Sequence, residues 1–184
     1  LDKDLKKILI FHNDPLKLSG SVKLEERKKI FENCEKILFV SNWVKERFFE
    51  GFKTKNNEKC EVVYPSINKL KKFPKKENLI IFVGKLNKST GYNLFGTAII
   101  KILNEFKNWK CIVIGDEPRE SYNFKHKNLK LLGWINHDRT LKFYEKSKIA
   151  VSPSTWDEPF GRTSMEAGSS CLLYTSPSPR DGIG

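Results

Sequence analysis

Residues 79–91 read Leu-Ile-Ile-Phe-Val-Gly-Lys-Leu-Asn-Lys-Ser-Thr-Gly. The first five residues form a short, continuously apolar run, which is typical of a strand covered on both faces of a parallel sheet. A loop between two glycines follows, and then an apolar stripe at helical spacing runs from Phe95 to Phe106. This stretch therefore predicts a strand, a glycine-bounded loop and a helix, which is the repeating unit of an α/β sheet.

The same alternation continues in both directions along the chain. Apolar stripes predict further helices near residues 22–34, 43–48 and 141–144, and Asn136 is the expected N-cap of the last of these. Short apolar runs predict strands at residues 8–12, 37–41, 61–64, 111–114, 130–132 and 149–152. The fold class that we predict is α/β, with doubly wound parallel sheets.

A lysine- and proline-rich stretch divides the pattern into two parts. Residues 65–76 contain two prolines and five lysines, which is typical of a linker, and we place the linker at residues 67–77. Residues 1–66 are too few for a complete doubly wound domain, so they resemble the last part of one. Residues 78–170 then form a second domain.

Composition limits the function less than the motifs do. The chain has 184 residues and a formal charge of +12, from 34 Lys and Arg against 22 Asp and Glu. This balance favours anionic partners such as nucleic acid, phosphorylated ligands or an acidic membrane surface. An equally good interpretation is a set of lysines spread over solvated faces. The four cysteines form no Cys-x-x-Cys pair, so no metal or redox motif is expected, and reduced cysteines suit a cytoplasmic compartment.

Glycines follow several of the predicted strands, where α/β sheets bind their ligands. Gly84 opens a loop that carries Lys85 and Lys88, which could meet phosphate oxygens, although a plain strand–helix turn explains it equally well. Gly115 could allow close approach of a ligand, but a tight turn is the favoured interpretation when this position is taken alone. Trp134 could pack under a nucleobase, and a place in the core is slightly favoured.

Residues 158–166, Glu-Pro-Phe-Gly-Arg-Thr-Ser-Met-Glu, hold the most specific pattern. A helix that starts near Gly161 would present free amides and a favourable dipole to an anion. Seven residues separate Glu158 from Glu166, so the two carboxylates would flank a diphosphate and accept hydrogen bonds from sugar hydroxyls. The alternative is that Glu166 is a surface helix residue and that Glu158 is an ordinary charge near the N-terminus of the helix. The amides expected to be free are those of Arg162, Thr163 and Ser164.

These segments together resemble a known family. Residues 158–167 look like the Glu-x7-Glu motif of retaining GT-B glycosyltransferases of the family 4 type, also called glycosyl transferases group 1. Residues 82–86, 113–116, 132–134 and 151–154 resemble further motifs of this family, in the same order and spacing, and the likeness extends to about residue 170. It implies a GT-B fold with two Rossmann-like domains, both incomplete in this chain. Because the chain begins at Leu1, a missing N-terminus is also expected.

The resemblance implies roles for individual residues. Lys85 stands in the place of a diphosphate-binding arginine, and Thr90 stands where the family usually has a lysine, for which Lys88 could compensate. Glu166 would hold the nucleotide ribose, and Glu158 would meet the donor sugar. The implied donor-binding set is Gly84, Lys85, Lys88, Thr90, Gly115, Trp134, Ile135, Phe160, Gly161, Arg162, Thr163, Ser164 and Glu166.

The resemblance also implies a reaction. A sugar would pass, with retention, from a nucleoside diphosphate sugar to a glycan or lipid-linked acceptor, for example in lipopolysaccharide biosynthesis, without a cofactor or metal. Glu158 and His12 are the implied catalytic residues, and His12 as an ordinary turn residue is about equally plausible.

Two alternatives lack catalysis. One is a basic module that binds nucleic acid, for which no recognised motif is present, and the other is a membrane-surface module that docks through residues 69–76. Peripheral contact with an anionic membrane is compatible with the enzyme as well. Residues 171–184 depart from the family pattern and are expected to be a non-native tail.

Overall fold

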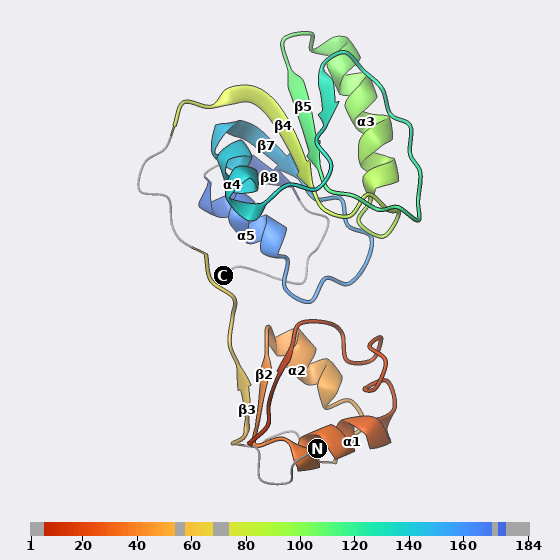
Figure 1. The fold of residues 1–184 in the computed structure, drawn as a ribbon, viewed down its shortest axis with the longest axis vertical. Coiled ribbons are helices and arrows are strands. Elements are labelled where there is room, and N and C mark those ends of the chain that lie inside the picture. The colour runs from red at the N-terminus through yellow and green to blue at the C-terminus, as the bar shows by residue number, and fades with distance from the viewer. Residues whose placement is uncertain (1–5, 54–57, 68–73, 171–172, 176–184) are drawn as a thin grey trace. The chain divides into compact units, whose positions relative to one another are not determined.

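The structure is a computed structural model, and it describes residues 6–53, 58–67, 74–170 and 173–175. The chain divides into two compact units, unit 1 (Leu1–Ser66) and unit 2 (Ile67–Gly184) (Figure 1). Of the predicted linker at residues 67–77, residues 68–73 lie outside the described residues. Each unit is described by itself below.

Unit 1 contains a parallel sheet in the order β1-β2-β3. Its elements are β1 (Ile8–Phe11), α1 (Leu24–Asn33), β2 (Lys36–Phe39), α2 (Asn42–Phe48) and β3 (Cys60–Val62). The core is aromatic: the rings of Phe11 and Phe39 stack at 5.8 Å between centroids, and Phe48 lies 5.2 Å from Phe11. Ser41 caps α2 by accepting a hydrogen bond from the amide of Val44 at 3.2 Å.

Among the described residues of unit 1, two charged side chains are buried. The guanidinium of Arg27, only 3% exposed, donates to the carbonyl oxygens of Ser21, Val22, Phe48 and Glu50 at 2.6–3.0 Å. Asp14, 2% exposed, pairs with Arg47 at 3.1 Å. Burial alone raises the pKa of Asp14, but hydrogen bonds from Arg47 and from the Leu16 amide outweigh burial, so the pKa is lowered.

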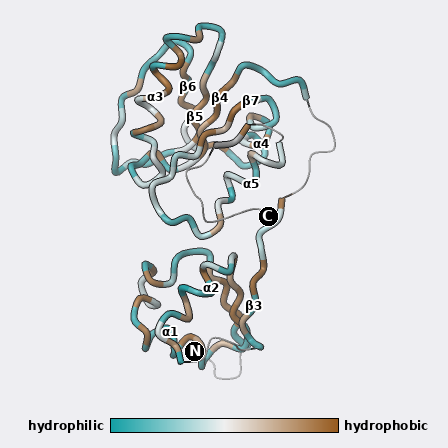
Figure 2. The backbone as a smooth tube through the Cα atoms, turned by 180° about the vertical axis from the view of Figure 1, so that it is seen from behind, coloured by the Kyte–Doolittle hydropathy of each residue, from teal (hydrophilic) through white to brown (hydrophobic). Residues whose placement is uncertain are grey.

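Unit 2 is built on a parallel sheet in the order β6-β5-β4-β7-β8. Its elements are β4 (Glu77–Val83), α3 (Tyr92–Glu105), β5 (Lys110–Ile114), β6 (Leu129–Leu131), α4 (His137–Lys146), β7 (Ser147–Val151), α5 (Arg162–Ser169) and β8 (Leu173–Thr175). Figure 2 shows the hydrophobic character of the central strands, as expected for strands covered on both faces.

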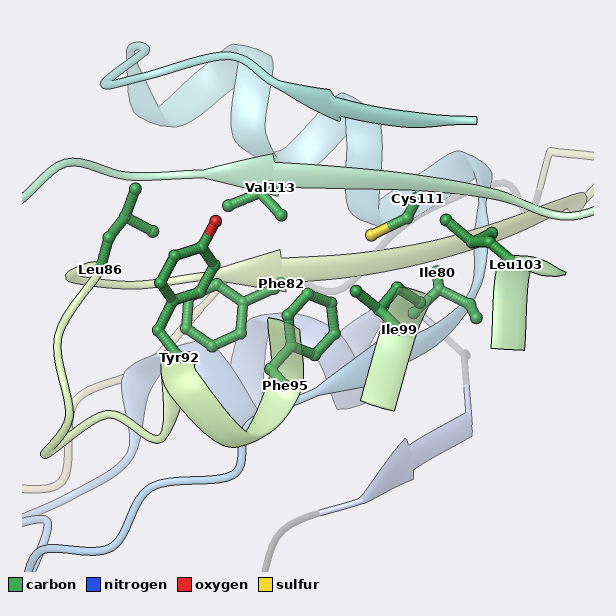
Figure 3. Packing of buried hydrophobic residues seen from close by; sticks show 9 residues of the cluster. All are labelled: Ile80, Phe82, Leu86, Tyr92, Phe95, Ile99, Leu103, Cys111 and Val113. Atoms are coloured by element: carbon green, nitrogen blue, oxygen red, sulfur yellow. The ribbon is translucent and has the colours of Figure 1, made fainter. Parts of the chain in front are cut away.

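Helices lie on both faces of this sheet (Figure 1). On one face, α3 packs its aromatic side chains on β4 and β5, with Phe95 and Tyr92 against Phe82 at 5.0 and 5.2 Å between ring centroids (Figure 3). On the other face, Tyr144 of α4 and Ala167 of α5 pack with residues of β4, β5 and β7 in a second apolar cluster. The two layers fix where the loops at the strand ends lie.

The predicted α/β fold with parallel strands is confirmed, with all seven predicted strands within two residues of the observed bounds. Asn136 caps α4, as predicted, because its Oδ1 accepts from the Arg139 amide at 3.0 Å. The sequence did not predict β8, which pairs with β7 in parallel register. This strand falls within the predicted tail at 171–184, whose non-native origin stays a prediction; residues 171–172 and 176–184 lie outside the described residues.

Candidate functional site

The carboxyl ends of β4, β5 and β6 are joined by the backbones of three glycines. The amide of Gly84 donates to the carbonyl of Ile114 at 3.0 Å, and the amide of Gly115 donates to the carbonyl of Gly133 at 2.9 Å. A Cβ atom on Gly115 would lie 1.8 Å from the Gly84 carbonyl oxygen, and φ at Gly115 is +141°. Glycine is therefore required at residue 115 by the neighbouring loop itself, a reason that does not depend on a ligand.

The loop at residues 84–91, called the lysine loop here, is organised by its own polar side chains. Oδ1 of the buried Asn87 accepts hydrogen bonds from the Ser89 hydroxyl and the Thr90 amide, both at 3.0 Å. The Thr90 hydroxyl donates to the carbonyl of Lys85 at 2.5 Å. Thr90 therefore shapes the loop that carries Lys85 and Lys88, whose side chains are exposed.

Neighbouring loops hold the lysine loop from two directions. The Lys88 amide donates to Oε2 of Glu120 at 3.0 Å, and Asn87 donates to Glu117 at 3.5 Å. The loop that follows β7 also contacts it, because the Thr155 amide donates to the Ser89 carbonyl at 2.9 Å. Gly91, with φ +74°, packs so closely there that an added Cβ would lie 1.9 Å from the Pro153 carbonyl oxygen.

Glu117 is a buried carboxylate at the edge of this arrangement. The guanidinium of Arg119 donates to its two oxygens at 2.7 and 2.9 Å. These hydrogen bonds lower the pKa of Glu117 to about 2, against the opposing effect of desolvation. Glu117 therefore stays ionised at neutral pH and anchors Asn87 in the lysine loop.

Helix α5 begins after Gly161, whose φ of +75° turns the chain into the first helical turn. The amide of Ser164 donates to the Gly161 carbonyl at 3.0 Å, so the prediction that this amide is free was wrong. The first turn of α5 is of the tight 3₁₀ type, so the Ser164 amide already donates a hydrogen bond within the helix. Within the described part of the chain, no hydrogen bond from the amides of Arg162 and Thr163 is seen.

Glu166 lies in the second turn of α5, and its side chain is only 6% exposed. Nε2 of His137, the first residue of α4, is 2.9 Å from Oε1 of Glu166. The guanidinium of Arg162 approaches the same oxygen at 3.6 Å, one helical turn earlier. The alternative interpretation of Glu166 as a surface residue is wrong, because the carboxylate is buried and paired.

The sequence did not single out His137. Its only sequence signal is its position, directly after an N-cap and a glycine-led loop at the end of a strand. The partner carboxylate is 29 residues away, so no local pattern links the two.

The remaining predicted site residues occupy varied environments. Trp134 is 78% exposed, so the slightly favoured interpretation of it as a core residue was wrong, while Ile135 packs against the cluster that contains Ala167. Glu158 and Phe160 are half-buried in the turn before α5. His12, in unit 1, follows β1 directly and is exposed.

An apolar cavity of about 460 Å³ lies between α3 and the sheet. Its walls include Phe95, Ile99, Ile149 and Val151, and every lining residue is apolar. A site of this kind offers no group for a phosphate or a ribose hydroxyl, so the polar strand ends are the better candidate. Among the described residues, no cluster of His, Cys, Asp and Glu suits a metal, and no helix has the length and apolarity needed to cross a bilayer.

Comparison with known protein sequences identifies a glycosyltransferase family. The sequence profile of the family "Glycosyl transferases group 1" matches residues 64–174. The uncharacterized glycosyltransferase MJ1607 of Methanocaldococcus jannaschii is 28% identical over 174 residues, which cover 81% of this chain and 43% of that protein. An uncharacterized 42.6 kDa protein in the cps region of Klebsiella pneumoniae is 28% identical, covering 77% and 38% respectively. The chain thus spans less than half the length of these two relatives.

Solved glycosyltransferase structures share the fold. The pneumococcal O-GlcNAc transferase GtfA, in complex with UDP and GlcNAc, matches 95% of this chain and 38% of its own with a TM-score of 0.69 and 14% identity. Anabaena HepE, in complex with UDP-glucose, matches 92% and 52% with a TM-score of 0.66 and 13% identity. The predicted likeness to part of the GT-B fold is confirmed by these matches.

Proposed function

The chain belongs to the glycosyl transferases group 1 family, and from this premise we propose that its parent enzyme transfers a sugar from a nucleoside diphosphate sugar to an acceptor. Unit 2 supplies the donor-binding part of that activity. UDP-glucose and UDP-GlcNAc are the first donors to test, because two proteins of similar fold are described with UDP-glucose, or with UDP and GlcNAc.

The proposal rests mainly on the surroundings of the Glu166 carboxylate. It is buried, yet its partners His137 and Arg162 are 52% and 66% exposed, so the group lies at the rim of the structure. A carboxylate there can accept hydrogen bonds from both hydroxyls of a ribose, and such charge-assisted bonds are about twice as strong as neutral ones. Glu166 is therefore the ribose-binding residue of the proposal.

The diphosphate would be held by groups of two neighbouring loops. Lys85 and Lys88 supply positive charge from the lysine loop, which the Thr155 amide ties to the segment before α5. The amides of Arg162 and Thr163 and the hydroxyls of Thr163 and Ser164 add donors at the start of α5. Stabilising the negative charge that develops on the departing nucleoside diphosphate is the main catalytic contribution expected of these groups.

Other residues complete the proposal. Glu158, with the amides of Phe160 and Gly161, would meet the hydroxyls of the donor sugar. Trp134 and Ile135 would lie near the base, and His12 of unit 1 would act on the donor sugar. We also propose a glycan or lipid-linked acceptor and peripheral contact with anionic membranes, and the relative from a cps region favours a cell-surface polysaccharide.

A nucleotide-binding experiment tests the proposal. UDP, ADP and GDP are titrated calorimetrically into the 184-residue chain and into Glu166→Gln. We expect one nucleotide to bind, and the substitution to weaken it about 10- to 100-fold, because a charge-assisted hydrogen bond contributes about 1.5–3 kcal/mol. Glu105→Gln, which changes an exposed carboxylate in α3, is the matched control and leaves affinity unchanged.

The proposal fails if no nucleotide binds, or if Glu166→Gln binds as tightly as the wild type. Transfer itself is measured with the parent enzyme, as release of the nucleoside diphosphate from UDP-glucose and UDP-GlcNAc in the presence of acceptor glycans.

A further inference from the structure

We propose that His137 is a positioning residue for Glu166: it holds one carboxylate oxygen, Oε1, so that the carboxylate is oriented to bind the hydroxyls of the nucleotide ribose. This inference rests on the proposed function and adds to it a residue outside the signature segment 158–166. The inference is based on the distance of 2.9 Å between Nε2 of His137 and Oε1 of Glu166.

His137 and Arg162 approach the Glu166 carboxylate at different distances. The His137 contact is within hydrogen-bonding distance, whereas Arg162 lies at 3.6 Å, which is an ion pair without a hydrogen bond. Both contacts meet at Oε1. The second oxygen, Oε2, and the remaining lone pair of Oε1 are then the acceptors that we assign to the 2′ and 3′ hydroxyls of the ribose.

The pair is fixed from both ends by one apolar cluster. Ile135, two residues before His137, packs against the cluster that contains Ala167, the residue after Glu166, and Ala167 is 0% exposed. The start of α4 is also set by the Asn136 cap, which binds the Arg139 amide. Since these anchors hold the two backbones, neither side chain needs to order a flexible segment when it binds the other.

The chemistry of imidazole suits this role. Nε2 donates a hydrogen bond to a carboxylate either as a neutral N–H or as part of an imidazolium. Among the described residues, the partner that Glu166 keeps without His137 is the exposed Arg162, which lies beyond hydrogen-bonding distance at 3.6 Å. The carboxylate would then turn toward water, and its bonds to the ribose would weaken.

The test compares UDP with 2′-deoxy-UDP, or the corresponding pair of whichever base binds in the nucleotide panel. Affinities are measured for the wild-type chain, His137→Ala, His137→Gln and the control Arg139→Gln, which alters an exposed side chain in the same turn. We expect His137→Ala to weaken UDP about tenfold and 2′-deoxy-UDP less than threefold, because 2′-deoxy-UDP keeps only one of the two ribose hydroxyls that the oriented carboxylate binds. His137→Gln restores at least half of the affinity through its amide N–H, and Arg139→Gln matches the wild type.

The outcomes separate this inference from the function on which it rests. If His137→Ala weakens both nucleotides equally, or neither, His137 does not position Glu166 for the ribose and the inference is overturned, while nucleotide binding stands. If no nucleotide binds to the wild-type chain, the proposed function fails together with the inference. Thermal unfolding of each variant, expected within a few degrees of the wild type, excludes loss of the fold as the cause.

Discussion

The two units bury charged groups in different ways. In unit 1, the guanidinium of Arg27 is surrounded by four carbonyl groups of its own chain and is 3% exposed. In unit 2, the carboxylate of Glu166 is almost as buried, but its partners His137 and Arg162 are more than half exposed. The chain completes the hydrogen bonds of Arg27, whereas Glu166 lies beside exposed side chains, and we propose that it binds a ligand there.

We propose that, between Arg27 and Glu166, this difference separates a structural charge from a ligand-binding one. When a buried charge makes all its hydrogen bonds within the chain, the charge and its partners stabilise the fold together. Removing the charge leaves several acceptors without a donor. Both oxygens of the buried Glu117 accept hydrogen bonds from Arg119, whereas the hydrogen bond between Glu166 and His137 uses Oε1 alone, so Glu166 keeps acceptor capacity for an incoming molecule. Burial alone would have placed Arg27 and Glu166 in one class, and their partners separate them.

The largest expected effect comes from Arg27→Met. The substitution leaves four carbonyl groups without their donor, so we expect unit 1 to lose about 3–5 kcal/mol of stability. Urea denaturation gives the size, and peptide-resolved hydrogen exchange over residues 21–50 locates it. Glu166→Gln is the counterpart in unit 2 and should change stability by less than about 1 kcal/mol. If Arg27→Met and Glu166→Gln lost equal stability, the distinction between the two buried charges would be wrong.

A smaller effect is expected at the glycines that join the strand ends of unit 2. Gly115→Ala places a Cβ atom 1.8 Å from a backbone oxygen, so the loops must separate, at a cost of about 2–4 kcal/mol. Gly133→Ala is the matched control, because φ there is +67° but nothing lies within 4 Å of the added atom. It should cost only the strain of about 1–2 kcal/mol. Chemical denaturation of both variants shows whether the loss of stability at Gly115 comes mainly from the steric clash or from backbone strain.

The smallest effect is the loss of Glu117's contribution to stability as the pH falls. Because the pKa of Glu117 is about 2 in the folded chain and about 4.5 when unperturbed, its contribution to stability is present above pH 4.5 and is lost as the pH falls toward 2. Glu117→Gln should therefore be less stable than the wild type at neutral pH, and the gap should narrow between pH 4.5 and 2. Urea midpoints across this range measure it. A constant gap would show that the Arg119 pair does not set the acid dependence.

The elements of the fold were predictable because their signals are local. Apolar runs of strand length, stripes at helical spacing and the Asn136 cap each lie within a few residues of the chain, and the structure confirms them. The strand β8 was missed because three residues next to a proline-containing segment carry too little periodicity. The amide of Ser164 was assigned wrongly because the hydrogen-bonding pattern of a first helical turn depends on the φ of Gly161.

The sequence by itself determined the order of strands and helices, the glycines at the strand ends and the spacing of Glu158 and Glu166. Residue identity and the periodicity of apolar residues along the chain encode these features directly. Only the tertiary structure decided what these residues contact: Gly115 packs on Gly84, and Glu166 meets His137 from 29 residues away. The physical reason is that such contacts follow from the register of the sheet and the packing of α4 and α5 on one face. No local pattern contains that information.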